Sequence, residues 1–171
     1  MFHRILVAVD GSSAAQNAFE RAVELVEAGH GRLGLLSSAP GPPPLPAAPV
    51  VIPVSRSQLE QDLLRWAQRN VNDAERLVPA GVPVTKLVTR GAPGPALLRE
   101  ARSGRWDLVV VGQTQRRFRW PFTKPVGEWL SRRSPTAVLV VHDESRDARL
   151  SGQAVPTPRR ARKLRAPVPA A

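Results

Sequence analysis

Short runs of apolar, mostly β-branched residues alternate along this chain with segments of helical periodicity. The runs lie at 5–9, 33–36, 108–111 and 137–141, and 82–88 is a further strand candidate that Pro83 near its start weakens. Uninterrupted apolar runs are typical of strands that are buried on both faces, as in a parallel sheet. Strands that alternate with helices predict a doubly wound α/β fold, here a single five-stranded parallel sheet with helices on both faces.

Apolar residues at helical spacing predict four helices, at 14–28, 57–78, 96–102 and 126–133. Ser12 or Ser13 is a good N-cap for the first helix, and Gly29 is a good residue to end it. Ser57 and Glu60 have the spacing of a capping box at the start of the second helix. The segment 91–95 is expected to form a turn before the third helix.

Proline and charge are unevenly distributed and mark two irregular segments. Seven of the 18 prolines lie in 39–53, which predicts a long extended loop because proline lacks a backbone donor. The last 26 residues hold seven Lys or Arg and one Asp, so more than half of the net charge of +11 lies there. We therefore predict an α/β domain over 1–143 and a basic, Pro/Arg-rich disordered tail over 144–171.

Several classes of site have no support in the residues. The chain has no cysteine, and His3, His30 and His142 are too scattered in sequence to suggest a metal site. No phosphate-binding P-loop and no nucleophile elbow is present, so we expect a binding protein rather than an enzyme. No apolar run approaches the roughly 20 residues of a membrane span, and the N-terminus does not read as a signal peptide. The cytoplasm is the expected location.

Four segments in the same order and spacing resemble universal stress proteins. They are the opening strand through Asp10, Gly11 and Ser12, the Gly-Ala-Pro turn at 91–93, the strand 107–112, and the Ser-Pro-Thr segment at 134–136 with the strand that follows it. The resemblance covers roughly 2–141 and implies a Rossmann-like sheet of order 3-2-1-4-5. Ligands of doubly wound sheets bind at the carboxyl ends of strands where the order reverses, here Val9–Asp10 and Val111–Gly112.

The ATP-binding members of that family carry Gly-x2-Gly-x9-Gly-Ser/Thr after the fourth strand, and this chain departs from the pattern. Gly112 matches the first glycine, but Gln115 stands at the second, and Pro125 and Val126 stand at the final pair. The first-strand side of the pocket is intact, and in ATP-binding relatives the equivalent of Asp10 lies near adenine and ribose. The resemblance therefore implies a nucleotide pocket with a degenerate ATP motif, in which ATP binding is weak or lost. Its candidate residues are Ala8, Asp10, Ser12, Ser38, Val111, Gly112, Thr114, Gln115, Lys124 and Val126.

Asp10 and Ser12 also have a plainer interpretation, since Asp-Gly-Ser is ordinary turn chemistry and Ser12 is a good N-cap. The basic stretch 115–124, which includes Phe118, Trp120 and Phe122, has three interpretations. Its aromatic residues could pack on the sheet, it could be a docking loop, or its cations could replace the glycine motif as a phosphate clamp. The tail could solubilise the protein or contact nucleic acid or anionic membranes weakly and non-specifically.

We predict a universal-stress-type regulatory module that acts in the stress response, with no cofactor assigned from the residues alone and ATP left open by the resemblance. Family members commonly form homodimers through the last strand, which here is Ala137–Val141, and an exposed apolar edge strand favours such pairing. The protein partner is unknown. Two alternatives remain: an adenine-nucleotide sensor that uses the basic loop, with slow ATP hydrolysis as a variant, and a protein associated with polyanions or membrane surfaces.

Overall fold

The structure is a computed structural model that describes residues 1–41, 55–113 and 125–142. The predicted sheet is confirmed: five parallel strands lie in the order β3-β2-β1-β4-β5. The strands are β1 (Arg4–Ala8), β2 (Arg32–Ala39), β3 (Val84–Arg90), β4 (Leu108–Gln113) and β5 (Ala137–His142). The helices are α1 (Ser13–Ala28), α2 (Arg56–Arg76), α3 (Pro93–Arg102) and α4 (Val126–Ser131).

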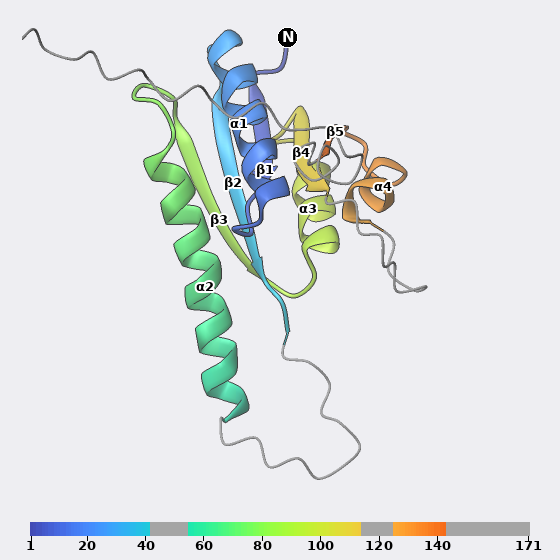
Figure 1. Ribbon diagram of the computed structural model, residues 1–171. Coiled ribbons are helices and arrows are strands. Elements are labelled where there is room, and N and C mark those ends of the chain that lie inside the picture. Colours follow the sequence, from blue (N-terminus) through green and yellow to red (C-terminus); the bar gives the residue numbers. More distant parts are fainter. Residues whose placement is uncertain (42–54, 114–124, 143–171) are drawn as a thin grey trace, which may run out of the picture.

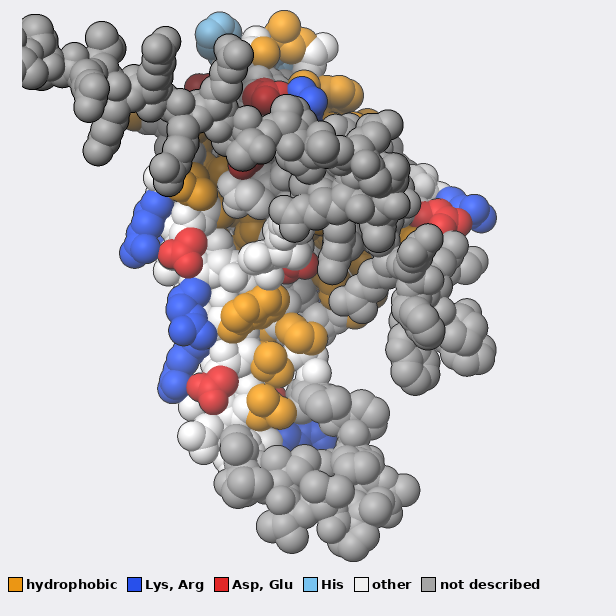
Figure 2. Space-filling model, in the orientation of Figure 1, with side chains coloured by type: hydrophobic (Ala, Val, Ile, Leu, Met, Phe, Trp, Pro, Cys, Tyr) orange, Lys and Arg blue, Asp and Glu red, His pale blue; other side chains and the backbone are white. Residues whose placement is uncertain are grey.

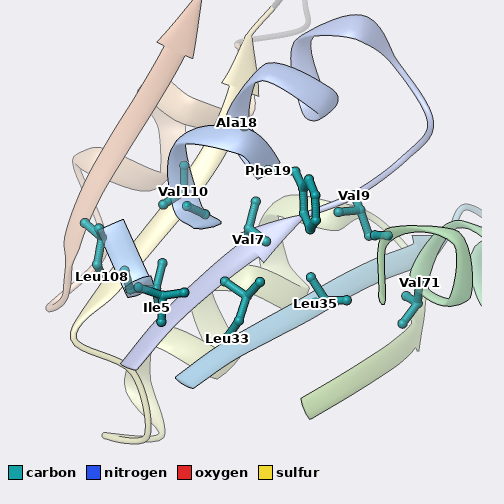
Figure 3. Packing of buried hydrophobic residues seen from close by; sticks show 13 residues of the cluster. Ile5, Val7, Val9, Ala18, Phe19, Leu33, Leu35, Val71, Leu108 and Val110 are labelled. Atoms are coloured by element: carbon teal, nitrogen blue, oxygen red, sulfur yellow. The ribbon is translucent and has the colours of Figure 1, made fainter. Parts of the chain in front are cut away.

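The helices form a layer on each face of the sheet, because each strand sends alternate side chains to opposite faces. Side chains from α1 and α2 pack with Ile5, Val7, Leu33 and others of one face, and Figure 3 shows Phe19 of α1 lying over this layer. Those of α3 and α4 pack with Leu6, Val109 and Val111 on the other face. The central strands β1, β2 and β4 are buried on both faces, as their apolar runs predicted.

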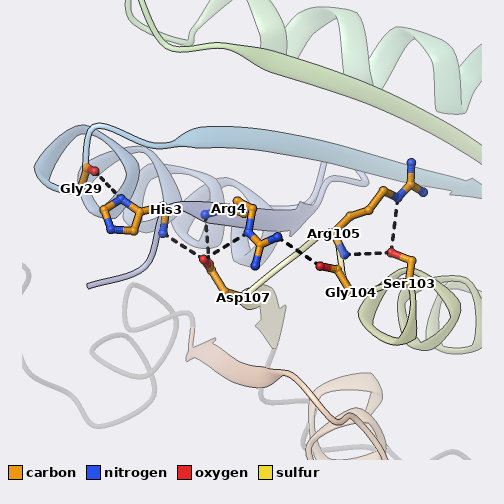
Figure 4. Close-up of polar contacts among 7 residues, drawn as sticks. All are labelled: His3, Arg4, Gly29, Ser103, Gly104, Arg105 and Asp107. Atoms are coloured by element: carbon orange, nitrogen blue, oxygen red, sulfur yellow. Dashed lines mark hydrogen bonds and ion pairs between the residues drawn. The ribbon is translucent and has the colours of Figure 1, made fainter.

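Asp107 ties the start of β1 to the start of β4 (Figure 4). Its carboxylate accepts hydrogen bonds from the backbone N–H groups of His3 and Arg4, at 3.2 and 3.0 Å. Arg4 Nε lies 3.6 Å from the same carboxylate, and the His3 ring contacts the carbonyl oxygen of Gly29 at 2.7 Å. The first strand is therefore fixed at its amino end, and its carboxyl end opens toward the opposite edge of the sheet.

The helix ends correct the prediction in several places. Ser55 caps α2 by accepting from the N–H of Gln58 at 3.2 Å, so the predicted capping box of Ser57 and Glu60 is wrong. Glu60 instead pairs with Arg56, with 3.6 Å between Arg56 Nε and the carboxylate. The helix starts at Arg56 because the first available hydroxyl, that of Ser55, already satisfies an amide of its first turn.

The predicted turn before α3 is also corrected, because that helix begins at a proline. The segment predicted as a turn at 91–95 is a turn only at Gly91 and Ala92, and α3 begins at Pro93. Proline fits the first position of a helix, where its N–H would have no partner and its fixed φ is already helical. Leu77 falls inside the helix predicted over 57–78, but it lies past the end of α2 and is 59% exposed.

The strand bounds differ from the apolar runs by a few residues, because pairing carries a strand beyond its apolar stretch. β2 extends to Ala39, and β3 follows it in register to Arg90 rather than ending at Val88. The other bounds agree closely with the prediction. In the described part of the chain, no helix combines the length and the apolar character needed to cross a membrane. Most of the predicted loop 39–53 and the whole predicted tail lie outside the described residues.

Candidate functional site

A cavity of about 280 Å³ opens at the carboxyl ends of β1, β2 and β4. The strand order reverses at this point, because β2 and β3 lie on one side of β1 and β4 and β5 lie on its other side. Its wall is mostly apolar and comes from all four helices as well as these strands. The lining residues are Ala8, Val9, Asp10, Ala15, Leu36, Ser38, Pro40, Trp66, Pro93, Leu97, Val111, Gly112 and Val126.

Asp10 is the acidic residue in this lining and lies two residues after the end of β1. Its Oδ1 accepts hydrogen bonds from the N–H of Ser12 at 3.0 Å and from the hydroxyl of Ser12 at 2.6 Å. Gly11, between them, has a φ of 75°, a conformation that suits glycine. The turn thus holds an exposed carboxylate at the rim of the cavity, where it can accept hydrogen bonds from a ligand's hydroxyl groups.

Ser12 contributes to this turn rather than to the cavity wall. Its hydroxyl oxygen accepts from the N–H of Ala15 at 3.2 Å, so Ser12 is the N-cap of α1. Its side chain lines a separate, smaller cavity of about 130 Å³ between α1 and α2. The plainer interpretation of Ser12 as a cap therefore agrees with the structure.

Ser38 is the second polar side chain of the wall and lies near the end of β2. Its hydroxyl donates to the carbonyl oxygen of Gly91 at 2.7 Å, which joins the end of β2 to the turn before α3. The Ser38 hydroxyl therefore already donates its proton, but the hydroxyl oxygen can still accept a hydrogen bond. Ser38 is half-buried, so a ligand in the cavity would meet this acceptor beside the apolar surface of Leu36.

Gly112 lies at the end of β4 for a reason of packing. A Cβ at this position would overlap the backbone carbonyl of Ala14 and approach the backbone nitrogen of Ala15 to 2.6 Å. The first turn of α1 therefore crosses directly over the end of β4, and glycine is the residue that permits this approach. The glycine that matched the ATP motif is thus required by the fold whether or not phosphate binds.

The far wall of the cavity is set by the contact of α3 with α4. Trp129 of α4 lies against Gly94 of α3, where an added Cβ would meet its ring at 3.3 Å. Gly127 brings α4 close to β5, because an added Cβ would lie 2.8 Å from Val140. This packing places Val126, Pro93 and Leu97 around the cavity.

Six of the ten candidate residues line the cavity: Ala8, Asp10, Ser38, Val111, Gly112 and Val126. Ser12 lies beside it as described, and Thr114, Gln115 and Lys124 lie outside the described residues. The motif position Pro125 precedes α4 as its N-cap residue, with no side-chain hydrogen bond to cap the helix. At that helix start, then, the described residues show a proline in place of the glycine of the ATP motif.

Trp66 is the most informative lining residue that the sequence interpretation missed. It lies on α2, inside the segment 57–78 that the helical spacing of apolar residues predicted, and three residues after Leu63, so that same spacing could have selected it. Figure 2 shows hydrophobic side chains gathered along the first half of α2, with Lys, Arg, Asp and Glu on its outer side. That half extends past the ends of the strands (Figure 1), which leaves Trp66 half-buried at the cavity.

Comparison with known proteins agrees with this fold. The model of the universal stress protein family (Usp) matches residues 1–142. The chain therefore belongs to the universal stress protein family, and the family resemblance read from the sequence is confirmed.

Solved structures of the same family share the fold. The universal stress protein UspA of Lactobacillus plantarum is 22% identical, with a TM-score of 0.65, over 81% of this chain and 97% of that chain. A family protein of Burkholderia pseudomallei is 26% identical, with a TM-score of 0.62, over 80% of this chain and 93% of that chain. A family protein of Arabidopsis thaliana, solved with AMP bound, is 19% identical, with a TM-score of 0.52, over 85% of this chain and 95% of that chain.

Proposed function

We propose that this protein is a regulatory binding module of the stress response whose cavity takes an adenine nucleotide by its adenosine part. The observation that supports this most is the cavity itself, which lies at the reversal of strand order with Asp10 at its rim. Small-molecule sites are typically apolar with a few placed polar groups, and this lining has that character. The AMP-bound Arabidopsis relative shows that a protein of the same fold holds this class of ligand.

The size and chemistry of the cavity suit the adenosine end. Its volume of about 280 Å³ is close to the lower limit, about 300 Å³, of typical ligand pockets, which favours a small ligand. Leu36, Val111 and Trp66 offer apolar and aromatic surface to a flat base. Asp10 offers a carboxylate to the hydroxyl groups of a ribose, a charge-assisted hydrogen bond.

Weak recognition of a triphosphate is the second part of the proposal. Phosphates bind well at helix N-termini, where free backbone N–H groups point at them. The helix that follows the motif region here, α4, has only six residues and is preceded by Pro125, which has no N–H to donate. Because packing explains Gly112, that glycine is no evidence for a phosphate site.

We further propose that the protein is a homodimer that pairs through β5. This strand lies at one edge of the sheet. Among the described residues, it pairs with β4 on its inner side and with no strand on its outer side. Its residues Val138, Leu139, Val140 and Val141 are only half-buried. Unpaired apolar edges favour association with another strand, and a second copy of the chain supplies one. We assign the module a binding role and no catalytic residue. The protein partner that would recognise the ligand-bound module is not identified.

Calorimetric titration of adenosine and AMP into the full chain tests the proposal. The variant Asp10→Asn keeps an oxygen that can accept from Ser12 but removes the charge. We expect it to weaken the binding of both ligands by about tenfold or more, because hydrogen bonds to charged groups contribute about 1.5–3 kcal/mol. Asp62→Asn is the matched control, since Asp62 is exposed on α2 and pairs with Arg65 at 3.1 Å.

The outcomes separate the alternatives. Binding that is unchanged in Asp10→Asn, or equally weakened in Asp62→Asn, would show that the carboxylate at the rim does not contact the ligand. Phosphate release from ATP by the wild-type chain would support the alternative of slow hydrolysis. The basic stretch 115–124 lies outside the described residues, so its part in an ATP sensor stays a prediction.

A further inference from the structure

A second cavity at the carboxyl ends of the strands, of about 220 Å³ and distinct from the small cavity that Ser12 lines, adjoins the first on the side of β3. It lies between the carboxyl ends of β2 and β3 and the first half of α2. Its lining residues are Ala39, Pro40, Gly41, Glu60, Leu64, Arg90 and Gly91. Pro40 lines both cavities, and Leu64 of the second lies two residues before Trp66 of the first on the same helix. The two cavities therefore lie next to each other along the first half of α2.

The backbone fixes where Arg90 stands in this second cavity. Arg90 is the last residue of β3 and pairs in register with Ala39, the last residue of β2. The N–H of Gly91 donates to the carbonyl oxygen of Ala39 at 2.8 Å and closes the pairing there. By strand alternation, Arg90 lies on the same face of the sheet as Val84 and Val88, the face that α2 covers.

Arg90 has no ion-pair partner within the described part of the chain. Its guanidinium makes no hydrogen bond or ion pair with another described residue, and the residue is exposed. Lys86, earlier on the same strand, instead pairs with Glu75 at 2.7 Å. Glu60, the acid in the lining of the second cavity, is paired with Arg56 at 3.6 Å. Among the described residues that line the second cavity, Arg90 is thus the available cation.

We propose that the second cavity is an anion subsite in which Arg90 binds the phosphate of the nucleotide whose adenosine part occupies the first cavity. This inference rests on the proposed function and adds to it the direction of the phosphate. A guanidinium presents a planar fork of N–H donors that matches two phosphate oxygens at once. A phosphate site at the end of β3 lets the protein bind a mononucleotide although Pro125, before α4, stands where the ATP motif has a glycine.

Titration of the full-length variants with AMP, adenosine and inorganic phosphate tests the subsite. In Arg90→Gln we expect AMP to bind about tenfold to a hundredfold more weakly, as the loss of a charge-assisted hydrogen bond predicts. We expect adenosine to bind that variant as it binds the wild type, and Arg90→Lys to recover part of the loss. Inorganic phosphate should compete with AMP and leave adenosine binding unchanged. Arg99→Gln, which removes an exposed arginine of α3, should leave the binding of all three unchanged.

Three results would overturn the subsite. In the first, Arg90→Gln weakens adenosine as much as AMP, which would make the role of Arg90 structural. In the second, Arg90→Gln and Arg99→Gln weaken AMP equally, which would reduce the effect to net charge. In the third, the wild type binds AMP no more tightly than adenosine; the adenosine pocket then stands and the subsite falls. If the wild type binds neither ligand, both proposals fall together, and thermal melts of each variant show whether it is folded.

Discussion

A side chain at position 112 would occupy space that the first turn of α1 already fills. The Cβ of an alanine there would overlap the backbone of Ala14, which cannot move aside as a flexible side chain can. We expect Gly112→Ala to lower the free energy of unfolding by about 1–3 kcal/mol, the usual effect of overpacking, with no ligand present. Urea unfolding followed by circular dichroism measures this.

Gly41→Ala is the control for that variant. A Cβ at Gly41 would meet no atom within 4 Å, so we expect its unfolding midpoint to match the wild type. If Gly112→Ala were as stable as Gly41→Ala, the close approach of α1 to β4 would not be what requires a glycine. The phosphate interpretation of Gly112 would then regain its weight.

At single positions, the sequence predicted part of the site and missed the rest for a physical reason. Asp10 and Ser38 follow or end strands, and parallel strands bring their carboxyl ends to one edge, so their convergence was predictable. Pro40, Pro93 and Trp66 reach the cavity from three separate elements. Helical spacing can place Trp66 on the inner face of its helix, but whether such a side chain lines a cavity depends on packing across elements, which local sequence does not specify.

At the scale of elements, the cap of α1 is the contact most open to a direct test. Ser12 accepts from the N–H of Ala15 and also holds Asp10 in its turn. We expect Ser12→Ala to reduce the free energy of unfolding by about 0.5–2 kcal/mol, the range for loss of an N-cap. Thermal unfolding of the variant beside Ser12→Thr, which keeps a hydroxyl, measures the effect. Equal losses in both variants would contradict a capping role.

The elements themselves were largely predictable, and their ends were less so. A run such as Ile5–Val9 has too little polar content for a surface strand, and its burial on both faces follows. The start of α2 was misplaced because Ser55 and Ser57 are both suitable caps and the sequence does not choose between them. The structure uses Ser55, whose backbone is extended with φ −66° and ψ 143°.

At the scale of the whole molecule, the edge strand β5 leads to a prediction about assembly. Size-exclusion chromatography with light scattering should give a mass of twice the 18.6 kDa of the chain. The expectation follows from the half-buried apolar side chains of that strand and from its outer side, which pairs with no strand among the described residues. A mass of 18.6 kDa at every concentration tested would contradict pairing through β5.

The central claim concerns the whole pocket: the protein binds the adenosine part of a nucleotide, and the triphosphate of ATP adds little to its affinity. Calorimetric titration of the full chain with AMP and with ATP, under the same salt and buffer, tests it most directly. The account predicts that AMP binds at least as tightly as ATP, because Pro125 removes a donor where the ATP motif has glycine. ATP binding at least tenfold tighter than AMP would contradict it and show that other residues form a triphosphate site.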